Sequence, residues 1–320
     1  MMGITATSLV GARPVSWIAA TATSRRLRIL AYHGISDLPA FKQHVHHLAR
    51  RYRPVSGEQV ASALRGQRSL PARAAWVTFD DGHPEVVTGA SRLLRDHGIQ
   101  ATLFVCPGMV DTTTPYWWES VRHAEALGFS VPGMSGSPAA PAEAALKLVP
   151  DAERRRIVRD LQDEIERRTG QALERPQMTS DQARTWLADG HQLGNHTWDH
   201  PLLDRCPPAE QVEQIARADE WLRGIDATSA ALFAYPNGNW SAVAEEELQR
   251  RGYLAAVGFD HRLSRSSSHP LRLSRLRVDA SAPLSRFRSI ISGTHPFLLR
   301  TRNHLLSGSS TVTDPRELPT

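Results

Sequence analysis

The sequence predicts an α/β fold in which parallel strands alternate with helices. Over residues 28–105, short runs of strand-forming residues alternate with longer stretches whose apolar residues recur at helical spacing. This alternation is typical of βα units that build a parallel sheet. Polar motifs follow several of the strand-like runs, and sites in such folds lie at the carboxyl ends of the strands. We therefore expect the functional residues at these strand ends.

The first elements can be placed in chain order. Ser56 and Gln59 have the spacing of a capping box, in which each side chain bonds the other residue's backbone N–H, so a helix should begin there. Pro84 suits the first turn of another helix. The predicted order is a strand at 28–32, a helix at about 41–52, a short helix at 56–64, a strand at 75–79, a helix at 84–98 and a strand at 101–105.

An insertion is predicted after the third strand, at about residues 107–177. Its first part is rich in Gly, Pro, Ala and Ser and carries an aromatic cluster at residues 116–118. We interpret this part as a lid or a wall of the substrate site. Ile157, Leu161 and Ile165 then mark one face of a helix.

The second half returns to the alternating pattern. Thr179 and Gln182 again have the spacing of a capping box, and Gly190 suits the end of that helix. The remaining predicted elements are a strand at 191–195, a helix at about 212–222, a strand at 231–235, a helix at 243–250 and a strand at 253–257.

The composition excludes several classes of protein. The net charge is +5, but the arginines are scattered and form no aromatic-basic module, so we expect no nucleic-acid partner. Cys106 and Cys206 have neither the spacing of zinc ligands nor a disulfide pattern. Two reduced thiols favour a cytoplasmic location, with secretion and peripheral membrane attachment as the alternatives.

The first chemical motif is Thr-Phe-Asp-Asp-Gly at residues 78–82. Adjacent side chains of an extended strand point in opposite directions, so Asp80 and Asp81 can serve different purposes. One carboxylate could bind a metal while the other acts as a general base. An Asp-Gly turn is also common in loops, so the pair alone leaves an ordinary turn open.

The second motif is His-Thr-Trp-Asp-His at residues 196–200, directly after a predicted strand. Two histidines four residues apart lie on one face of a helical turn and can share one metal ion. Together with one carboxylate, two imidazoles and an open position describe a catalytic divalent-metal site. A third motif, Tyr-Pro-Asn-Gly at residues 235–238, predicts a turn whose backbone N–H groups face a substrate oxygen, or else a simple connection between strand and helix.

These three motifs, in this order, resemble the NodB-homology polysaccharide deacetylases, carbohydrate esterase family four. The resemblance spans about residues 28–279, and the early Tyr32-His33 pair and residues 271–278 resemble one branch of that family. It implies a distorted (β/α)7 barrel. The domain would then cover residues 28–280, after a disordered leader at 1–27 and before a C-terminal helix and tail at 281–320.

The resemblance also implies a role for each motif residue. Asp81, His196 and His200 would bind one divalent metal ion, most simply Zn²⁺, with Co²⁺, Ni²⁺ or Fe²⁺ as alternatives. Asp80 would be the general base. The oxyanion would be held at the third motif, residues 235–237 (Tyr235, Pro236 and Asn237), with the backbone N–H of Asn237 as the matching donor.

Two positions depart from the family pattern. Many members carry an Arg at the position of Ala234, where it orients the catalytic Asp. The family's general-acid His belongs to a late Leu-x-His motif, but the matching residues 271–275 contain no His. His33 and His83 follow predicted strands and are the better candidates for the missing acid. His261 and His269 are the further candidates.

The predicted function is removal of an N-acetyl group from an amino sugar in a polysaccharide, oligosaccharide or glycoconjugate. A small glycosylated metabolite is an alternative substrate, and a glycan-binding pseudoenzyme is an alternative of another class. Trp117, Trp118, Trp198 and Trp240 could stack on sugar rings. The C-terminal segment carries Phe287, Ile290 and Ile291 beside two arginines, which indicates a helix packed on the barrel or, alternatively, a helix on a membrane surface.

Overall fold

The structure is a computed structural model that describes residues 13–131, 142–226, 231–265 and 267–295. Its strands share one sheet with the path β7-β6-β5-β4-β3-β1-β8, and β2 pairs with β3 beside that path. The strands are β1 (Arg28–Tyr32), β2 (Arg53–Pro54), β3 (Ala74–Phe79), β4 (Ala101–Val105), β5 (Gln192–Asn195), β6 (Leu232–Ala234), β7 (Ala255–Val257) and β8 (Leu276–Arg277).

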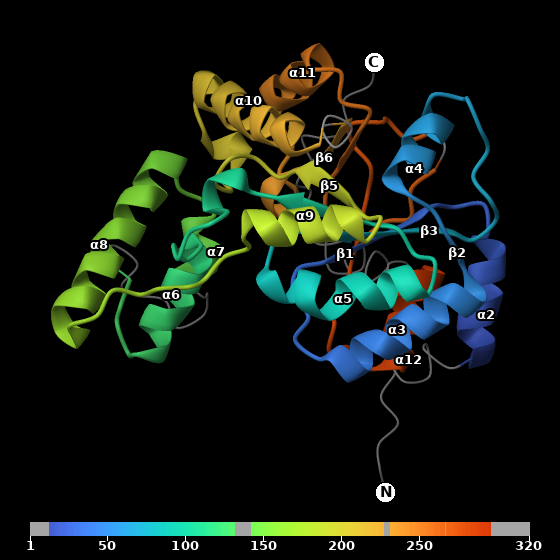
Figure 1. The fold of residues 1–320 in the computed structure, drawn as a ribbon, viewed down its shortest axis with the longest axis horizontal. Coiled ribbons are helices and arrows are strands. Elements are labelled where there is room, and N and C mark those ends of the chain that lie inside the picture. Colours follow the sequence, from blue (N-terminus) through green and yellow to red (C-terminus); the bar gives the residue numbers. More distant parts are fainter. Residues whose placement is uncertain (1–12, 132–141, 227–230, 266, 296–320) are drawn as a thin grey trace, which may run out of the picture.

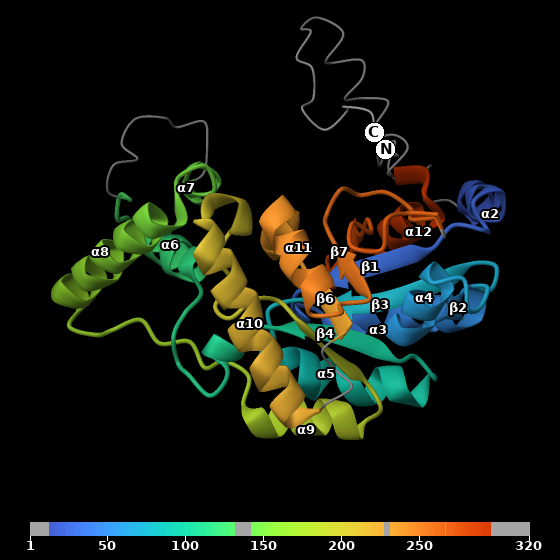
Figure 2. The same cartoon turned by 90° about the horizontal axis from the view of Figure 1, so that it is seen from above.

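Helices surround this sheet, as Figures 1 and 2 show. The α-helices are α2 (Arg13–Ala22), α3 (Leu38–Arg51), α4 (Gly57–Leu64), α5 (Pro84–Asp96), α6 (Trp117–Ala126), α7 (Ala142–Leu146), α8 (Asp151–Thr169), α9 (Ser180–Ala188), α10 (Pro208–Ile225), α11 (Ala242–Arg250) and α12 (Leu284–Ser292). Both predicted capping boxes are present, at the starts of α4 and α9. Three-residue 3-10 helices are η1 (Pro107–Met109), η2 (Leu203–Arg205) and η4 (Pro236–Gly238).

The sheet curls into the expected distorted (β/α)7 barrel. Every pairing between named strands is parallel. Residues 271–277 close the barrel, because Leu273 bridges Val257 of β7 while Leu276 pairs with Leu30 of β1. Parallel strands in such a barrel present their carboxyl ends at one rim.

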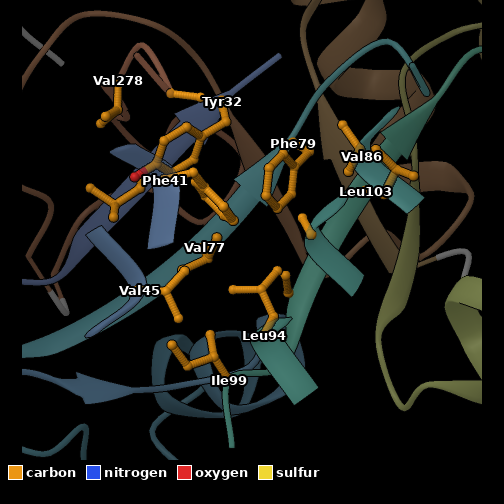
Figure 3. Close-up of a cluster of buried hydrophobic side chains, with 14 of the residues drawn as sticks. Tyr32, Phe41, Val45, Val77, Phe79, Val86, Leu94, Ile99, Leu103 and Val278 are labelled. Carbon is orange, nitrogen blue, oxygen red and sulfur yellow. The ribbon is translucent and has the colours of Figure 1, made fainter. Parts of the chain in front are cut away.

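Successive side chains of each strand point to opposite faces of the sheet, so the apolar core consists of an inner and an outer cluster. Side chains from opposite parts of the barrel meet in one cluster, which includes Ile29, Trp76, Phe104 and Leu273 and so fills the interior. The larger cluster lies between the outer face of the sheet and helices α3 and α5, and Figure 3 shows part of it. Its labelled members are Tyr32, Phe41, Val45, Val77, Phe79, Val86, Leu94, Ile99, Leu103 and Val278. Burying an aliphatic or aromatic side chain of this kind contributes about 1.5–3 kcal/mol.

The insertion has a core of its own. Val121 of α6, Leu146 of α7 and Ile157 of α8 belong to one buried cluster. Figures 1 and 2 show these three helices together at the end of the molecule opposite α2. The predicted helix around Ile157 to Ile165 is therefore α8.

The described part of the predicted leader is more ordered than we expected. Disorder was predicted for residues 1–27, but residues 13–22 form α2, which packs against α12, and Ala20 and Leu27 are buried. The helix forms because its apolar residues gather on one face, although polar residues interrupt the apolar run in the sequence. Residues 1–12 lie outside the described residues.

The C-terminal helix lies against the barrel. Phe287, Ile290 and Ile291 of α12 are all buried, so this face is not available for a membrane surface. The interpretation of a helix packed on the barrel is therefore confirmed for α12, while residues 296–320 lie outside the described part of the chain. Among the described helices, none has the length and apolar character needed to cross a bilayer.

Candidate metal and catalytic site

The three predicted metal ligands converge at the carboxyl ends of the strands. Asp81 follows β3, and His196 and His200 follow β5. Asp81 Oδ1 lies 3.4 Å from His196 Nε2 and 3.5 Å from His200 Nε2. All three side chains are buried, and their ligand atoms lie within 4.8 Å of one another. The sequence motifs, more than a hundred residues apart, thus meet at one point.

The three residues fit a divalent metal ion. Tetrahedral coordination with bonds of about 2.0–2.1 Å separates ligand atoms by about 3.3 Å, close to the observed spacings. Asp81 Oδ1 is buried and has no hydrogen-bond partner, which is costly for a carboxylate unless a cation satisfies it. His196 Nδ1 lies 2.7 Å from the carbonyl oxygen of Ala234. Since a carbonyl only accepts, Nδ1 carries the proton and the Nε2 lone pair faces Asp81, as in histidine ligands of metals.

The electrostatics of the three residues suit ligand binding. Burial alone raises the pKa of Asp81, but the imidazoles around its carboxylate, those of His196 and His83 first, outweigh it and hold the pKa well below its usual value. Burial lowers the pKa of His200 to about 3. At neutral pH Asp81 is therefore ionised and His200 is neutral, and these are the forms that bind a metal.

The backbone at this site departs from the helical turn that we expected for the histidine motif. Residues 196–200 form an irregular loop in which Thr197 has φ 70° and His200 has φ 64°. Asp81 has φ 71°. A non-glycine residue with positive φ costs about 1–3 kcal/mol, and such residues persist where surrounding contacts enforce them. The convergence of the ligands comes from this strained loop, which residue spacing alone could not reveal.

The general-base candidate, Asp80, is held by an arginine that the sequence analysis did not identify. Arg275 Nη1 lies 2.6 Å from Asp80 Oδ1, and Nη2 lies 2.7 Å from Oδ2. Both side chains are buried inside the barrel. Arg275 also donates to Thr78 Oγ1 and to the carbonyl of Gly258. Burial alone raises the pKa of Asp80, but the charges of Arg275 and His196 outweigh it, so the pKa is lowered and Asp80 is ionised.

Arg275 supplies a cation beside Asp80, where many family members use an arginine at the position of Ala234. Its guanidinium lies 5.6 Å from the ring centroid of Phe104, and Phe104 and Ala234 belong to the same buried cluster. Position 234 thus lies in the same interior cluster that the guanidinium of Arg275 approaches. The absence of an Arg at position 234 does not leave Asp80 without a cation.

A pocket of about 380 Å³ opens over the metal-ligand cluster. The proton-donor candidates His33 and His83 both line it, as do Asp81 and His200. His83 Nε2 lies 3.6 Å from Asp81 Oδ2, and the His33 ring stacks on Phe259 at 5.6 Å. Burial lowers the pKa of both imidazoles, but for His83 the nearby carboxylate of Asp81 outweighs it and the pKa is raised.

The two further candidates for the proton donor, His261 and His269, lie in different places relative to the pocket. His261 also lines the pocket, whereas His269 lies 3.7 Å from Glu245 and is not among the lining residues. The candidate His269 is therefore wrong, because the segment that carries it turns away toward α11 before it reaches the rim.

The third motif supplies one residue to the pocket. Asn237 lines it and has φ 55°, so its backbone is turned at the end of β6. Tyr235 cannot offer a second backbone donor, because its N–H is bonded to the carbonyl of Val257, and its buried ring belongs to a core cluster. Pro236 has no N–H. Of the three residues expected to face the oxyanion, only Asn237 is among those that line the pocket.

Tyr116 of the insertion contacts the backbone of the metal-ligand candidate Asp81. The Tyr116 hydroxyl donates to the backbone carbonyl of Asp81 at 2.5 Å, where Asp81 holds its positive φ. The Tyr116 ring also stacks on Trp118, whose ring meets that of His200 at 4.6 Å. Trp117 and Trp118 line the pocket, so residues of the insertion form one wall of it.

Arg155 of α8 supports the histidine loop. Its guanidinium donates to both oxygens of Asp199, at 3.0 and 2.7 Å, and also to Asp151. Gln214 accepts from the backbone N–H groups of Trp198 and Asp199. Trp198 is thus held in this supporting layer, under the guanidinium of Arg217 rather than in the pocket. Trp240 likewise lies outside the pocket lining, with Arg272 stacked over its ring at 3.9 Å.

The chain matches a family model and a curated relative. A family model described as polysaccharide deacetylase matches residues 67–256, more than half of the chain. A chitin deacetylase of Colletotrichum lindemuthianum is 32% identical over 73 residues, which are 23% of this chain and 29% of that protein. The chain thus matches less than a third of the length of that curated relative.

Solved structures share the fold over nearly their whole length. The deacetylase PplD of Streptococcus pyogenes, in complex with acetate, has a TM-score of 0.59 and 17% identity, covering 83% of this chain and 98% of that one. IcaB of Ammonifex degensii has a TM-score of 0.57 and 19% identity, covering 84% and 97%. At these identities the likeness demonstrates a common fold.

Proposed function

The chain belongs to the polysaccharide deacetylase family, and from this premise we propose that it hydrolyses the N-acetyl amide of an amino sugar with the help of one divalent metal ion. The observation that carries the proposal is the meeting of Asp81, His196 and His200 beside the arginine-held carboxylate of Asp80. Two imidazoles and one carboxylate leave a coordination position open, as catalytic sites require. Zn²⁺ is the proposed ion, and Co²⁺, Ni²⁺ or Fe²⁺ suit the same ligands.

Asp81, His196 and His200 would hold the metal, which supplies Lewis-acid activation of the acetyl carbonyl and of the attacking water. Asp80 then accepts the proton of that water, because Arg275 keeps it ionised and fixes the plane of its carboxylate. Asn237 offers its backbone N–H to the carbonyl oxygen as negative charge develops there. Acetate and a free amine are the products.

The leaving nitrogen needs a proton, and the proposed donor is His83 or His33. Both imidazoles line the pocket above the ligand cluster. In this structure the Asp81 carboxylate raises the pKa of His83 whereas burial lowers the pKa of His33, and this difference favours His83 as the donor. Separate His83→Gln and His33→Gln variants distinguish them: loss of the donor lowers kcat by about 10²–10⁴-fold and removes the alkaline limb of the pH profile.

The proposed substrate is an N-acetylated sugar in a polymer, oligomer or glycoconjugate. Trp117 and Trp118 give the pocket an aromatic wall on which a sugar ring can stack. The pocket volume of about 380 Å³ is within the range of small-ligand sites, so it can receive one or two sugar units with the remainder of a chain outside.

The test is release of acetate from N-acetylglucosamine oligomers and from monomeric N-acetylated glycosides, followed by mass spectrometry for loss of one acetyl group. We expect turnover that chelation abolishes and Zn²⁺ or Co²⁺ restores. Asp80→Asn should remove turnover while metal binding persists. Faster turnover of the monomers would favour a small glycosylated metabolite. Tight sugar binding with no turnover by metal-loaded protein would contradict the proposal and support the pseudoenzyme.

A further inference from the structure

A second and larger pocket lies at the opposite end of the barrel from the metal-ligand cluster. Its volume is about 540 Å³, and helices α2, α3 and α12 form its walls. Arg73, which lines it, directly precedes β3, whereas Asp80 directly follows β3. The two pockets therefore lie beyond opposite ends of β3, the larger one at its amino end. Figures 1 and 2 show α2 beside α12 at this end.

The lining of this pocket is cationic. Its basic residues are His46, His47, Arg50, Arg51, Arg73 and Arg288. None of the described residues that line it is an Asp or a Glu. Arg50 and Arg51 lie in the last turn of α3, where they also stabilise the helix dipole, but that role does not account for cations contributed by other segments. A pocket whose ionisable side chains are nearly all basic, with four arginines among them, attracts an anion.

A buried arginine beside the pocket adds to this charge. Arg28 is fully buried, and the hydrogen bonds that its guanidinium donates within the described residues all go to uncharged oxygens, among them the carbonyls of Thr23 and Ile291. Its guanidinium lies 5.5 Å from the ring centroid of Tyr52, which lines the pocket. A buried cation without a carboxylate partner is costly, and an anion in the adjacent pocket would offset part of that cost.

The rim of the pocket is apolar. Trp17 lines the pocket, and Trp17 and Ile18 of α2 are 57% and 61% exposed. A cationic cavity with adjacent exposed aromatic and aliphatic side chains matches an amphiphile, whose phosphate enters the cavity while its apolar part meets the rim. This pairing distinguishes the pocket from a site for a free anion, which has no use for an apolar rim.

We propose that this pocket binds the phosphate of an acidic phospholipid, so that the α2 face of the barrel docks on an anionic membrane surface. The metal-ligand pocket then faces away from the membrane, because it lies at the other ends of the strands. The proposal does not depend on the deacetylase activity.

The test is sedimentation of the full chain with vesicles of phosphatidylcholine alone or mixed with phosphatidylglycerol. We expect binding to the mixed vesicles only. Arg50→Gln with Arg51→Gln should lower the affinity about 25-fold, because each arginine near an anionic surface contributes about fivefold. Trp17→Ser with Ile18→Ser should lower it about tenfold or more.

The matched control is Arg167→Gln with Arg168→Gln on α8, which removes the same charge from exposed positions at the other end of the molecule. Equal losses in the pocket and control variants would overturn the proposal, because net charge would then explain the binding. Inorganic phosphate provides the second arm. If the chain binds millimolar phosphate but sediments with neither kind of vesicle, the pocket takes a free anion and the membrane assignment is wrong.

Discussion

Removing Arg275 should damage both the fold and the general base. Arg275 and Asp80 form a buried pair through two hydrogen bonds of 2.6 and 2.7 Å. Arg275→Met leaves the Asp80 carboxylate buried and unpaired, which costs about 3–5 kcal/mol of unfolding free energy. With the arginine gone, the pKa of Asp80 rises, since the largest charge that opposed the effect of burial is absent. The base is then protonated over more of the pH range, and kcat should fall by about 10²–10⁴-fold.

The assays are urea unfolding and the pH dependence of acetate release. Activity of the variant should be lost at a higher pH on the acidic side than in the parent protein, because Asp80 must lose its proton to act. Arg275→Lys keeps the charge without the two-point contact, so it should retain most of the pH profile at a reduced rate. Arg272→Met serves as the control, because Arg272 belongs to the same segment but pairs with Glu245. A normal rate and an unchanged acidic limb in Arg275→Met would refute the assignment.

Three further substitutions test the layer around the ligands. Tyr116→Phe removes the hydroxyl that bonds the Asp81 carbonyl, so we expect a loss of about 1–3 kcal/mol in urea unfolding and weaker Zn²⁺ binding by competition with a chelator; unchanged Zn²⁺ affinity would show that Asp81 needs no such support. Arg155→Ala frees Asp199 and should lower Zn²⁺ affinity about 10–100-fold in the same titration, whereas no change would mean that α8 does not position the loop. Trp118→Ala should raise KM for sugar oligomers more than it lowers kcat, and a pure loss of kcat would assign Trp118 to the chemistry instead.

Much of the fold could be predicted from local patterns. The strands at 28–32 and 101–105 are β1 and β4 as predicted, and both capping boxes are present because their signals lie within four residues. The strands β2 and β8 were missed, since each has two residues and shows no periodicity. Barrel closure depends on pairing between residues far apart in sequence, so it rested on the family resemblance.

The candidate site, like the fold, could be predicted from the sequence only in part. Asp81, His196 and His200 could be found because order and strand-end position added to weak local motifs. Arg275 could not, because it is one of 38 basic residues and only the barrel brings it beside Asp80. Tyr116 was noted as aromatic, but its bond to the Asp81 carbonyl depends on how the insertion folds back over β3.

The most direct test of the metal site is the metal content of the purified protein, measured by inductively coupled plasma mass spectrometry after loading with Zn²⁺ and removal of the excess. We predict one tightly bound ion per chain in the parent protein and in Asp80→Asn. Asp81→Ala, His196→Ala and His200→Ala should each lose it, together with acetate release. Full metal content in any of these three ligand variants would contradict the assignment of Asp81, His196 and His200 as the ligands.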